Sequence, residues 1–130
     1  MSARPEEQIQ RAIVRALRIA LPHGFIVMAV PNKPRSHVSG AIEKSMGAMA
    51  GWPDLQVMGC LIGEDPADAR PFTGFMEVKT PKGRVQPVQR EMHDRLTDCG
   101  FPVAVVRSVE DALATAQAWG LPIKTMRVSA

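Results

Sequence analysis

The 130-residue sequence contains no long apolar run and only two cysteines, and each absence argues against a class of protein. No stretch approaches the roughly 20 consecutive apolar residues that a membrane-spanning helix needs. Cys60 and Cys99 lie far apart and form no Cys-x-x-Cys motif. A disulfide framework and a zinc site of cysteine and histidine are therefore not expected. The polar segment 1–7 does not resemble a secretory signal, so we expect a cytoplasmic protein.

The sequence also lacks the signature of a hydrolase with a serine or cysteine nucleophile. It contains no Gly-x-Ser-x-Gly motif, and none of its three histidines lies in an evident triad. With 45% hydrophobic and 22% charged residues, the composition is that of an ordinary globular protein rather than a disordered one. The length suits a single domain that covers residues 1–130. The net charge of +3 permits an anionic partner but does not require one.

Hydrophobic periodicity and turn residues predict helices and strands in the order α-β-β-β-α-β-α. The expected helices cover residues 5–21, 87–99 and 109–119, and the expected strands cover residues 25–30, 54–61, 72–80 and 102–107. The connection 31–53 is unusually long, which indicates a functional loop, and residues 41–50 could form a short helix within it. The last two strands, joined through a helix, are expected to be parallel. The strand at 102–107 is apolar throughout and is expected to be buried on both faces.

Two acids and a lysine are the strongest candidates for chemistry. Asp54 ends the segment Gly51-Trp52-Pro53-Asp54 at the start of the second strand, and Glu77-Val78-Lys79 ends the third strand. Side chains alternate along a strand, so Glu77 and Lys79 share a face. If the second and third strands pair, Asp54 and Glu77 meet at one end of the sheet.

Such a pair of acids has a chemical use. Two close carboxylates resist ionisation unless a cation lies between them. Oxygen ligands favour Mg²⁺ or Mn²⁺, which can polarise a phosphodiester and lower the pKa of a bound water. Lys79 could orient or deprotonate that water, or neutralise charge on the phosphate. A Glu-x-Lys pattern on a strand is more often a solvated charge pattern, so the position of Asp54 is what favours catalysis.

The first helix carries an acid on its inner face. In a helical projection, Glu6 lies within about 20° of Ile13 and Leu17, whereas Glu7 points into a stripe of arginines. A buried charge needs a partner, so we expect Glu6 rather than Glu7 to be functional. The alternative is that the first helical turn frays and leaves Glu6 in solvent.

Taken together, these segments resemble the VRR-NUC domain, a branch of the PD-(D/E)xK nuclease superfamily. The resemblance runs from about Glu6 to Ala112. The matching segments are Glu6-Glu7-Gln8-Ile9-Gln10, Asn32, Met46-Gly47, Gly51-Trp52-Pro53-Asp54, Glu77-Val78-Lys79, Gly83, Gln89 and Val105-Val106-Arg107-Ser108. The name motif of the family ends in a second arginine, where this chain has Ser108, and we interpret that segment as a strand and a helix cap.

The resemblance implies an α/β fold with a restriction-endonuclease-like core, in which helices flank a central mixed sheet. It also implies a nuclease that depends on Mg²⁺ or Mn²⁺ and uses no organic cofactor. Asp54 and Glu77 would bind the metal ion, with the carbonyl of Val78 as a further ligand. Gln89 would reach back to the site from the following helix. The implied catalytic residues are Glu6, Asp54, Glu77, Lys79 and Gln89.

Stand-alone members of this size are similar to Holliday-junction resolvases and are commonly encoded by phages. The resemblance therefore implies branched DNA as the substrate, a role in DNA repair, and the cytoplasm of a bacterial or phage-infected cell. Symmetric cleavage of a junction needs two active sites, so we expect a homodimer. Candidates for contacts with DNA are Asn32, Lys33, Arg35, His37, Lys44, Lys82 and Arg84. Trp52 could stack on an exposed base or pack inside the protein.

Three alternatives stay open at this stage. One is a nuclease that cuts flaps, splayed arms or DNA of any structure. Family members that are fused to larger proteins cleave flaps and other branched DNA. Another is a catalytically silent DNA-binding module of the same fold, which the complete set of Asp54, Glu77 and Lys79 argues against. A restriction-type enzyme would need an element that enters the major groove, and the sequence has no spare helix for it.

Overall fold

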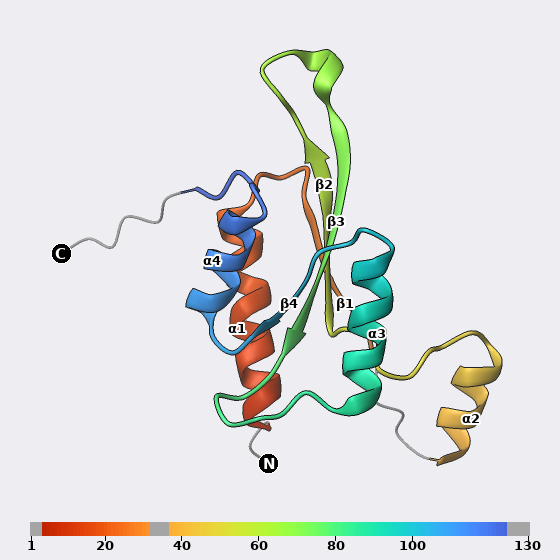
Figure 1. Ribbon diagram of the computed structural model, residues 1–130. Helices are drawn as coiled ribbons and strands as arrows, with labels where there is room; N and C mark the ends of the chain where they lie inside the picture. The colour runs from red at the N-terminus through yellow and green to blue at the C-terminus, as the bar shows by residue number, and fades with distance from the viewer. Residues whose placement is uncertain (1–3, 32–36, 125–130) are drawn as a thin grey trace.

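The computed structural model describes residues 4–31 and 37–124, which form a four-stranded sheet with helices on both faces (Figure 1). The elements are α1 (Pro5–Ala20), β1 (Ile26–Ala29), α2 (His37–Ser45), β2 (Leu55–Leu61), the short 3₁₀ helix η1 (Pro66–Asp68), β3 (Arg70–Val78), α3 (Pro87–Asp98), β4 (Val103–Val106) and α4 (Val109–Ala118). The predicted α/β fold class and element order are confirmed, with α2 lying in the long connection between the first two strands. No helix in these described parts of the chain is long and apolar enough to cross a membrane.

The sheet is mixed, with the strand order β1-β2-β3-β4. β1 pairs with β2 and β2 with β3 in antiparallel fashion, whereas β3 and β4 are parallel, as the intervening helix predicted. Leu55 faces Met76 across the β2–β3 ladder, and Val78 faces Val106 across the β3–β4 ladder. β2 and β3 are therefore the central strands. Glu77 lies on β3, Asp54 directly precedes β2, and Lys79 directly follows β3.

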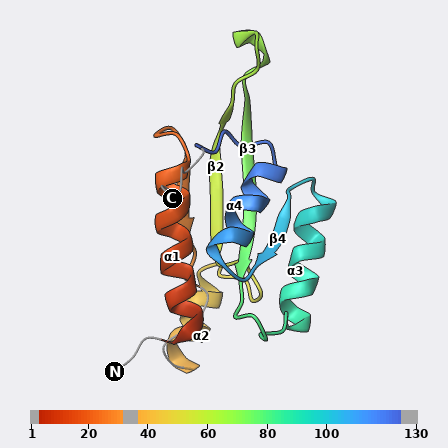
Figure 2. The same ribbon diagram turned by 90° about the vertical axis from the view of Figure 1, so that its left-hand side faces the viewer.

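The two faces of the sheet are covered by different helices. α1 and α4 pack on one face, and α3 lies on the other (Figures 1 and 2). The larger core, beneath α1 and α4, includes Met76 and Val78 of β3, whereas Phe75 of the same strand packs beneath α3 with Met92 and Leu96. Because side chains alternate along β3, Glu77 lies on the same face of the sheet as Phe75.

Two predictions about individual elements were wrong. β4 is not buried on both faces, because it is a four-residue strand at the edge of the sheet, and Val105 is 36% exposed. The short helix expected at 41–50 instead covers His37–Ser45. Gly47 stops it with a φ of 105°, a left-handed conformation that favours glycine and ends helices.

Candidate active site

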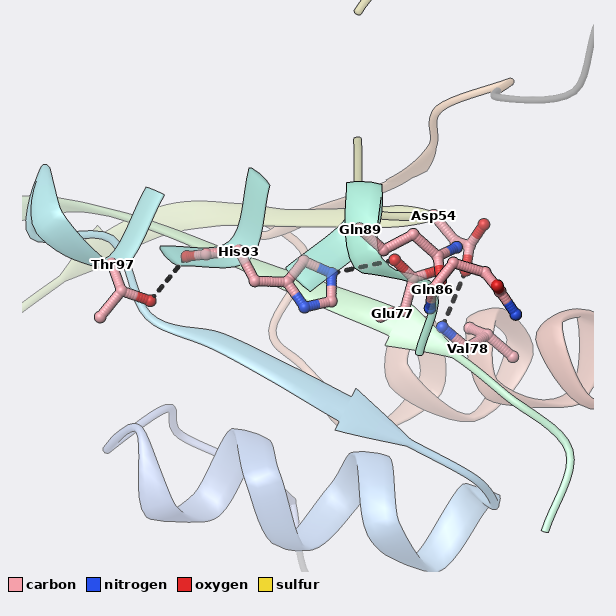
Figure 3. Close-up of polar contacts among 7 residues, drawn as sticks. All are labelled: Asp54, Glu77, Val78, Gln86, Gln89, His93 and Thr97. Atoms are coloured by element: carbon pink, nitrogen blue, oxygen red, sulfur yellow. Dashed lines mark hydrogen bonds and ion pairs between the residues drawn. The ribbon is translucent and has the colours of Figure 1, made fainter. Parts of the chain in front are cut away.

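The pairing of β2 with β3 brings the two candidate acids together. Asp54 directly precedes Leu55, the partner of Met76, so it lies beside Glu77 at one end of the sheet. The backbone carbonyl of Asp54 also accepts a hydrogen bond from Val30, 2.8 Å away, which ties the start of β2 to the end of β1. The site is thus built where the two central strands meet, as Figure 3 shows.

The Asp54 carboxylate is held by the backbone of β3. Its Oδ2 atom accepts a hydrogen bond of 2.8 Å from the backbone N–H of Val78, the residue after Glu77. Asp54 is only 9% exposed, and Pro53 before it is fully buried. Backbone and packing therefore fix the orientation of this carboxylate, as a preorganised ligand would require.

Glu77 is the most buried acid of the site, with 1% of its surface exposed. Its Oε1 atom lies 3.0 Å from Nε2 of His93, and its carboxyl also shares a hydrogen bond with Asp54. Burial raises the pKa of Glu77 to about 9, helped by the hydrogen bond and charge of Asp54 and by the charge of Glu6, while Lys79 opposes the rise. Without a bound cation, the pair of Asp54 and Glu77 therefore favours holding a proton at neutral pH.

Lys79 lies on the same face of the chain as Glu77 and is 7% exposed. Its backbone N–H donates to the carbonyl of Val106 at 3.0 Å, which extends the β3–β4 pairing past the end of β3. The positive charge of the Lys79 ammonium group lowers the pKa of Glu77 and so offsets part of the rise that burial and Asp54 cause. The structure thus brings an ammonium group to the two acids, the combination that the sequence spacing predicted.

Glu6 reaches the site from the first turn of α1. It is half-buried, whereas Glu7 is exposed, which is the orientation that the helical projection predicts. The charge of Glu6 contributes to the raised pKa of Glu77. Its role in catalysis stays a prediction.

Gln89 stands on the first turn of α3, next to the turn that precedes β2. Its side-chain oxygen accepts a hydrogen bond of 2.8 Å from the backbone N–H of Gln86, and Figure 3 shows its side chain beside Asp54 and Glu77. Gly51 has a φ of 81°, and a Cβ atom there would lie 2.3 Å from the carbonyl oxygen of Val88. Because the helix cap uses the oxygen of Gln89, its amide nitrogen is the donor that this side chain would offer to a substrate.

His93 contacts the site but was missed by the sequence analysis. It lies four residues after Gln89, one helical turn along the same face of α3, and this spacing is the signal that could have found it. From the sequence, histidines were weighed as zinc ligands, as members of a triad and, at His37, as a contact with DNA. Burial lowers the pKa of His93, and the positive charge of Lys79 acts in the same direction. Asp94 and Asp54 oppose this shift, and the net lowering of the pKa favours the neutral imidazole.

Arg107, from the segment that resembles the family's name motif, supports the loop next to the site. Its Nη1 atom donates to the carbonyl oxygens of Thr80 and Gly83, each at 2.7 Å. Ser108 begins α4 as predicted, because its hydroxyl accepts from the backbone N–H of Asp111. The carboxylate of Asp111 accepts from the backbone of Arg107 instead of closing a capping box with Ser108.

The candidates for DNA contacts are only partly described. Lys82 and Arg84 are exposed on the connection between β3 and α3, and Lys44 is exposed on α2. Both segments lie at the end of the molecule where β3 ends (Figures 1 and 2). Asn32, Lys33 and Arg35 lie outside the described residues, as does the side chain of His37.

Trp52 packs inside the protein. Its ring meets that of Phe75 edge to face, with ring centroids 5.5 Å apart, and it borders the smaller core under α3. The half-buried position favours the packing role over stacking on a base.

The acids suit a hard divalent cation. Among residues 4–31 and 37–124, no group of three or more histidine, cysteine, aspartate and glutamate side chains has the spacing of a complete metal site. Mg²⁺, however, is commonly held by one or two carboxylates, with water and phosphate oxygens as the other ligands. The structure brings the carboxylates of Asp54 and Glu77 together as candidate donors, and the carbonyl of Val78 stays a predicted further ligand. A cation would also relieve the repulsion that helps raise the pKa of Glu77.

Comparisons with known proteins bear on the family and the fold of the chain. The family model described as "VRR-NUC domain" matches residues 4–110. A solved structure described as "VRR_NUC domain protein" is similar to the chain with a TM-score of 0.67 and 18% sequence identity. The match covers 92% of this chain and 90% of that one, which supports the fold. The comparison with curated proteins found no match.

Proposed function

Because this chain belongs to the VRR-NUC family, a family of nuclease-type DNA-processing domains, we propose that it is a metal-dependent endonuclease of branched DNA. The Holliday junction is the substrate that we favour. The observation that carries the proposal is the buried pair of Asp54 and Glu77 beside Lys79 at the end of β3. We further propose that the protein acts as a single nuclease domain in DNA repair, in the cytoplasm of a bacterial or phage-infected cell.

The chain supplies the ligands and the charge for phosphodiester hydrolysis. Asp54, Glu77 and the carbonyl of Val78 would hold Mg²⁺ or Mn²⁺, which supplies Lewis acidity toward the phosphate and lowers the pKa of a bound water. Asp54 is ready for this role, because its carboxylate is already fixed by the N–H of Val78. Glu77 must lose its proton before it can act as a ligand.

Lys79 would act on the attacking water or on the phosphate. An ammonium group that is 7% exposed interacts more strongly with a developing negative charge than one in solvent. Glu6 and the amide nitrogen of Gln89 would orient the water and the phosphate from the ends of α1 and α3. We assign catalysis to Glu6, Asp54, Glu77, Lys79 and Gln89 on this basis.

DNA would approach the end of the sheet where β3 ends. Lys44, Lys82 and Arg84 are exposed near that end. The undescribed Asn32, Lys33 and Arg35 precede α2, which begins at His37. A junction has two scissile strands, and each protomer offers one pair of acids. We therefore propose a homodimer as the active form.

The first test is cleavage of a labelled panel that contains a four-way junction, a 5′ flap, a splayed arm and plain duplex, each with Mg²⁺, Mn²⁺ or EDTA. We expect metal-dependent paired nicks in the junction, and a loss of at least about 100-fold in rate in Lys79→Ala, as for removal of one transition-state contact. Lys124→Ala, which removes an exposed charge, is the matched control.

The panel separates the alternatives. Cutting of flaps or splayed arms alone would assign the protein to the flap nucleases, and equal cutting of plain duplex would remove the structural specificity. DNA binding without cleavage in either metal would contradict the nuclease proposal and favour a silent DNA-binding module.

A further inference from the structure

We propose that His93 is a positioning residue that holds Glu77 in the orientation needed to bind the metal ion, an inference that rests on the proposed function. The two side chains come from different elements, Glu77 from β3 and His93 from α3. Nε2 of His93 and Oε1 of Glu77 are 3.0 Å apart, with the carboxylate 1% and the imidazole 12% exposed (Figure 3).

The direction of this hydrogen bond follows from the chemistry of the two groups. An ionised carboxylate can only accept hydrogen bonds. When Glu77 binds a cation as a carboxylate, Nε2 of His93 must therefore carry the hydrogen that it donates to Oε1. A nitrogen that carries a hydrogen has no lone pair for a metal ion, so Nε2 acts on the metal through Glu77 and not as a direct ligand.

The contact fixes a torsion that the backbone does not control. The terminal torsion of a glutamate has a broad, roughly two-fold profile, so strand geometry alone does not set the plane of the carboxylate. Asp54 differs, because the N–H of Val78 already holds one of its oxygens. His93 supplies Glu77 with the donor that the backbone supplies to Asp54, and each acid keeps one oxygen fixed.

α3 is anchored well enough to place the imidazole. Met92 and Leu96, on either side of His93 in the sequence, are buried against Phe75 of β3. Thr97 donates from its hydroxyl to the carbonyl of His93 at 2.8 Å, within the same helix. The position of the imidazole is therefore set by the same strand that carries Glu77.

Two substitutions separate donation from packing. His93→Leu keeps an apolar body of similar size but removes the donor. His93→Gln keeps a donor, because the amide nitrogen of glutamine lies about as far from Cβ as Nε2 of histidine does. His23→Leu, at an exposed histidine, is the matched control.

The test measures Mn²⁺ binding to the metal-free protein by calorimetry, without DNA, alongside thermal unfolding in EDTA. We expect wild type and His23→Leu to bind equally, His93→Leu to bind about 10-fold more weakly, and His93→Gln to recover most of the affinity. Asp54→Asn should abolish binding and so identifies the site. Thermal unfolding in EDTA shows whether each variant is folded, and this readout should not follow the order of metal affinities.

Several outcomes would overturn the inference. Equal Mn²⁺ affinity in wild type and His93→Leu would remove the positioning role, and equal weakening in His93→Leu and His93→Gln would mean that the ring itself is required. A wild type that binds no Mn²⁺ would refute the inference together with the metal site. If His93 tunes Mn²⁺ affinity as expected but no DNA is cut, the inference stands and the nuclease proposal fails.

Discussion

Glu77 combines burial, a neighbouring acid and a neighbouring imidazole in one side chain. Its pKa of about 9 means that the metal-free protein keeps a proton that the unfolded chain releases near pH 4.5. Asp54, Glu6, Lys79 and His93 all contribute charge or a hydrogen bond to this environment. A carboxyl group in this state is a poor ligand until a cation displaces its proton, so metal binding and deprotonation are linked.

A pH dependence of stability follows for the metal-free protein. The folded state holds more protons than the unfolded state between about pH 4.5 and 9, so the contribution of Glu77 is complete below pH 4.5 and declines as pH rises toward 9. Glu77→Gln should remove this decline, which has a slope of at most ~1.4 kcal/mol per pH unit. Urea unfolding in EDTA at several pH values measures the difference between the two proteins. Parallel pH profiles for wild type and Glu77→Gln would contradict the raised pKa.

The sequence revealed some residues of the site and not others. Asp54, Glu77 and Lys79 were predictable as neighbours because strand alternation and one antiparallel pairing suffice to bring them together. His93 was not, because its four-residue spacing from Gln89 points to the site only once the position of that helix over the sheet is known. Glu6 was oriented correctly because its helix is strongly amphipathic.

At the scale of the elements, the connection from β3 to α3 depends on a distant side chain. The guanidinium of Arg107 holds the carbonyls of Thr80 and Gly83, so the end of β4 fixes the turn that follows Lys79. The sequence predicted the strand and the cap around Arg107, since both are local patterns. It did not predict the hydrogen bonds of the Arg107 side chain, because Thr80 lies 27 positions and Gly83 lies 24 positions before Arg107 in the sequence. The exposure of β4 was missed for a related reason: an apolar run does not reveal whether its strand lies at the edge of a sheet.

Arg107→Ala should loosen this turn. We expect a loss of about 1–2 kcal/mol in the free energy of unfolding, because two short hydrogen bonds from a charged donor disappear. Arg84→Ala removes the same charge from the exposed neighbouring loop and should leave stability within about 0.5 kcal/mol. Urea unfolding and hydrogen exchange of the Gly83 amide, which donates to Thr80, measure both effects. Unchanged exchange at Gly83 in Arg107→Ala would refute the supporting role.

At the scale of the whole molecule, exposed basic side chains gather near the end that carries the acids. Lys44 comes from α2, whereas Lys82 and Arg84 come from the connection to α3, so two separate segments flank the site. An acidic site that accepts a polyanion needs such flanking charge, together with a metal ion. The fold as a whole followed from the sequence, because element order and strand pairing were set by local patterns and short connections.

Removal of these charges should change how salt affects DNA binding. The variant Lys44→Ala/Lys82→Ala/Arg84→Ala should bind the junction more weakly. The slope of log affinity against log salt concentration should also become shallower by up to about 3, because each lost cation neutralises roughly one phosphate fewer. Fluorescence anisotropy in EDTA across a salt series measures binding without cleavage. The control for net charge is a matched triple alanine variant of exposed residues outside the proposed DNA-binding set, namely Arg11, Arg15 and Lys124. If both variants show the same slope, the proposed DNA-binding residues are wrong.

The hydrogen bond from Val78 to Asp54 links the register of the sheet to the assembly of the site. A slip of one residue between β2 and β3 would turn Glu77 to the opposite face and separate it from Asp54. A misfolded or partly folded chain would then lack the proposed metal site altogether. Because a ligand that binds only the native state stabilises that state, metal ions would select the correct register. If the proposed nuclease function holds, the chain would therefore be unable to cut DNA until its folding is complete.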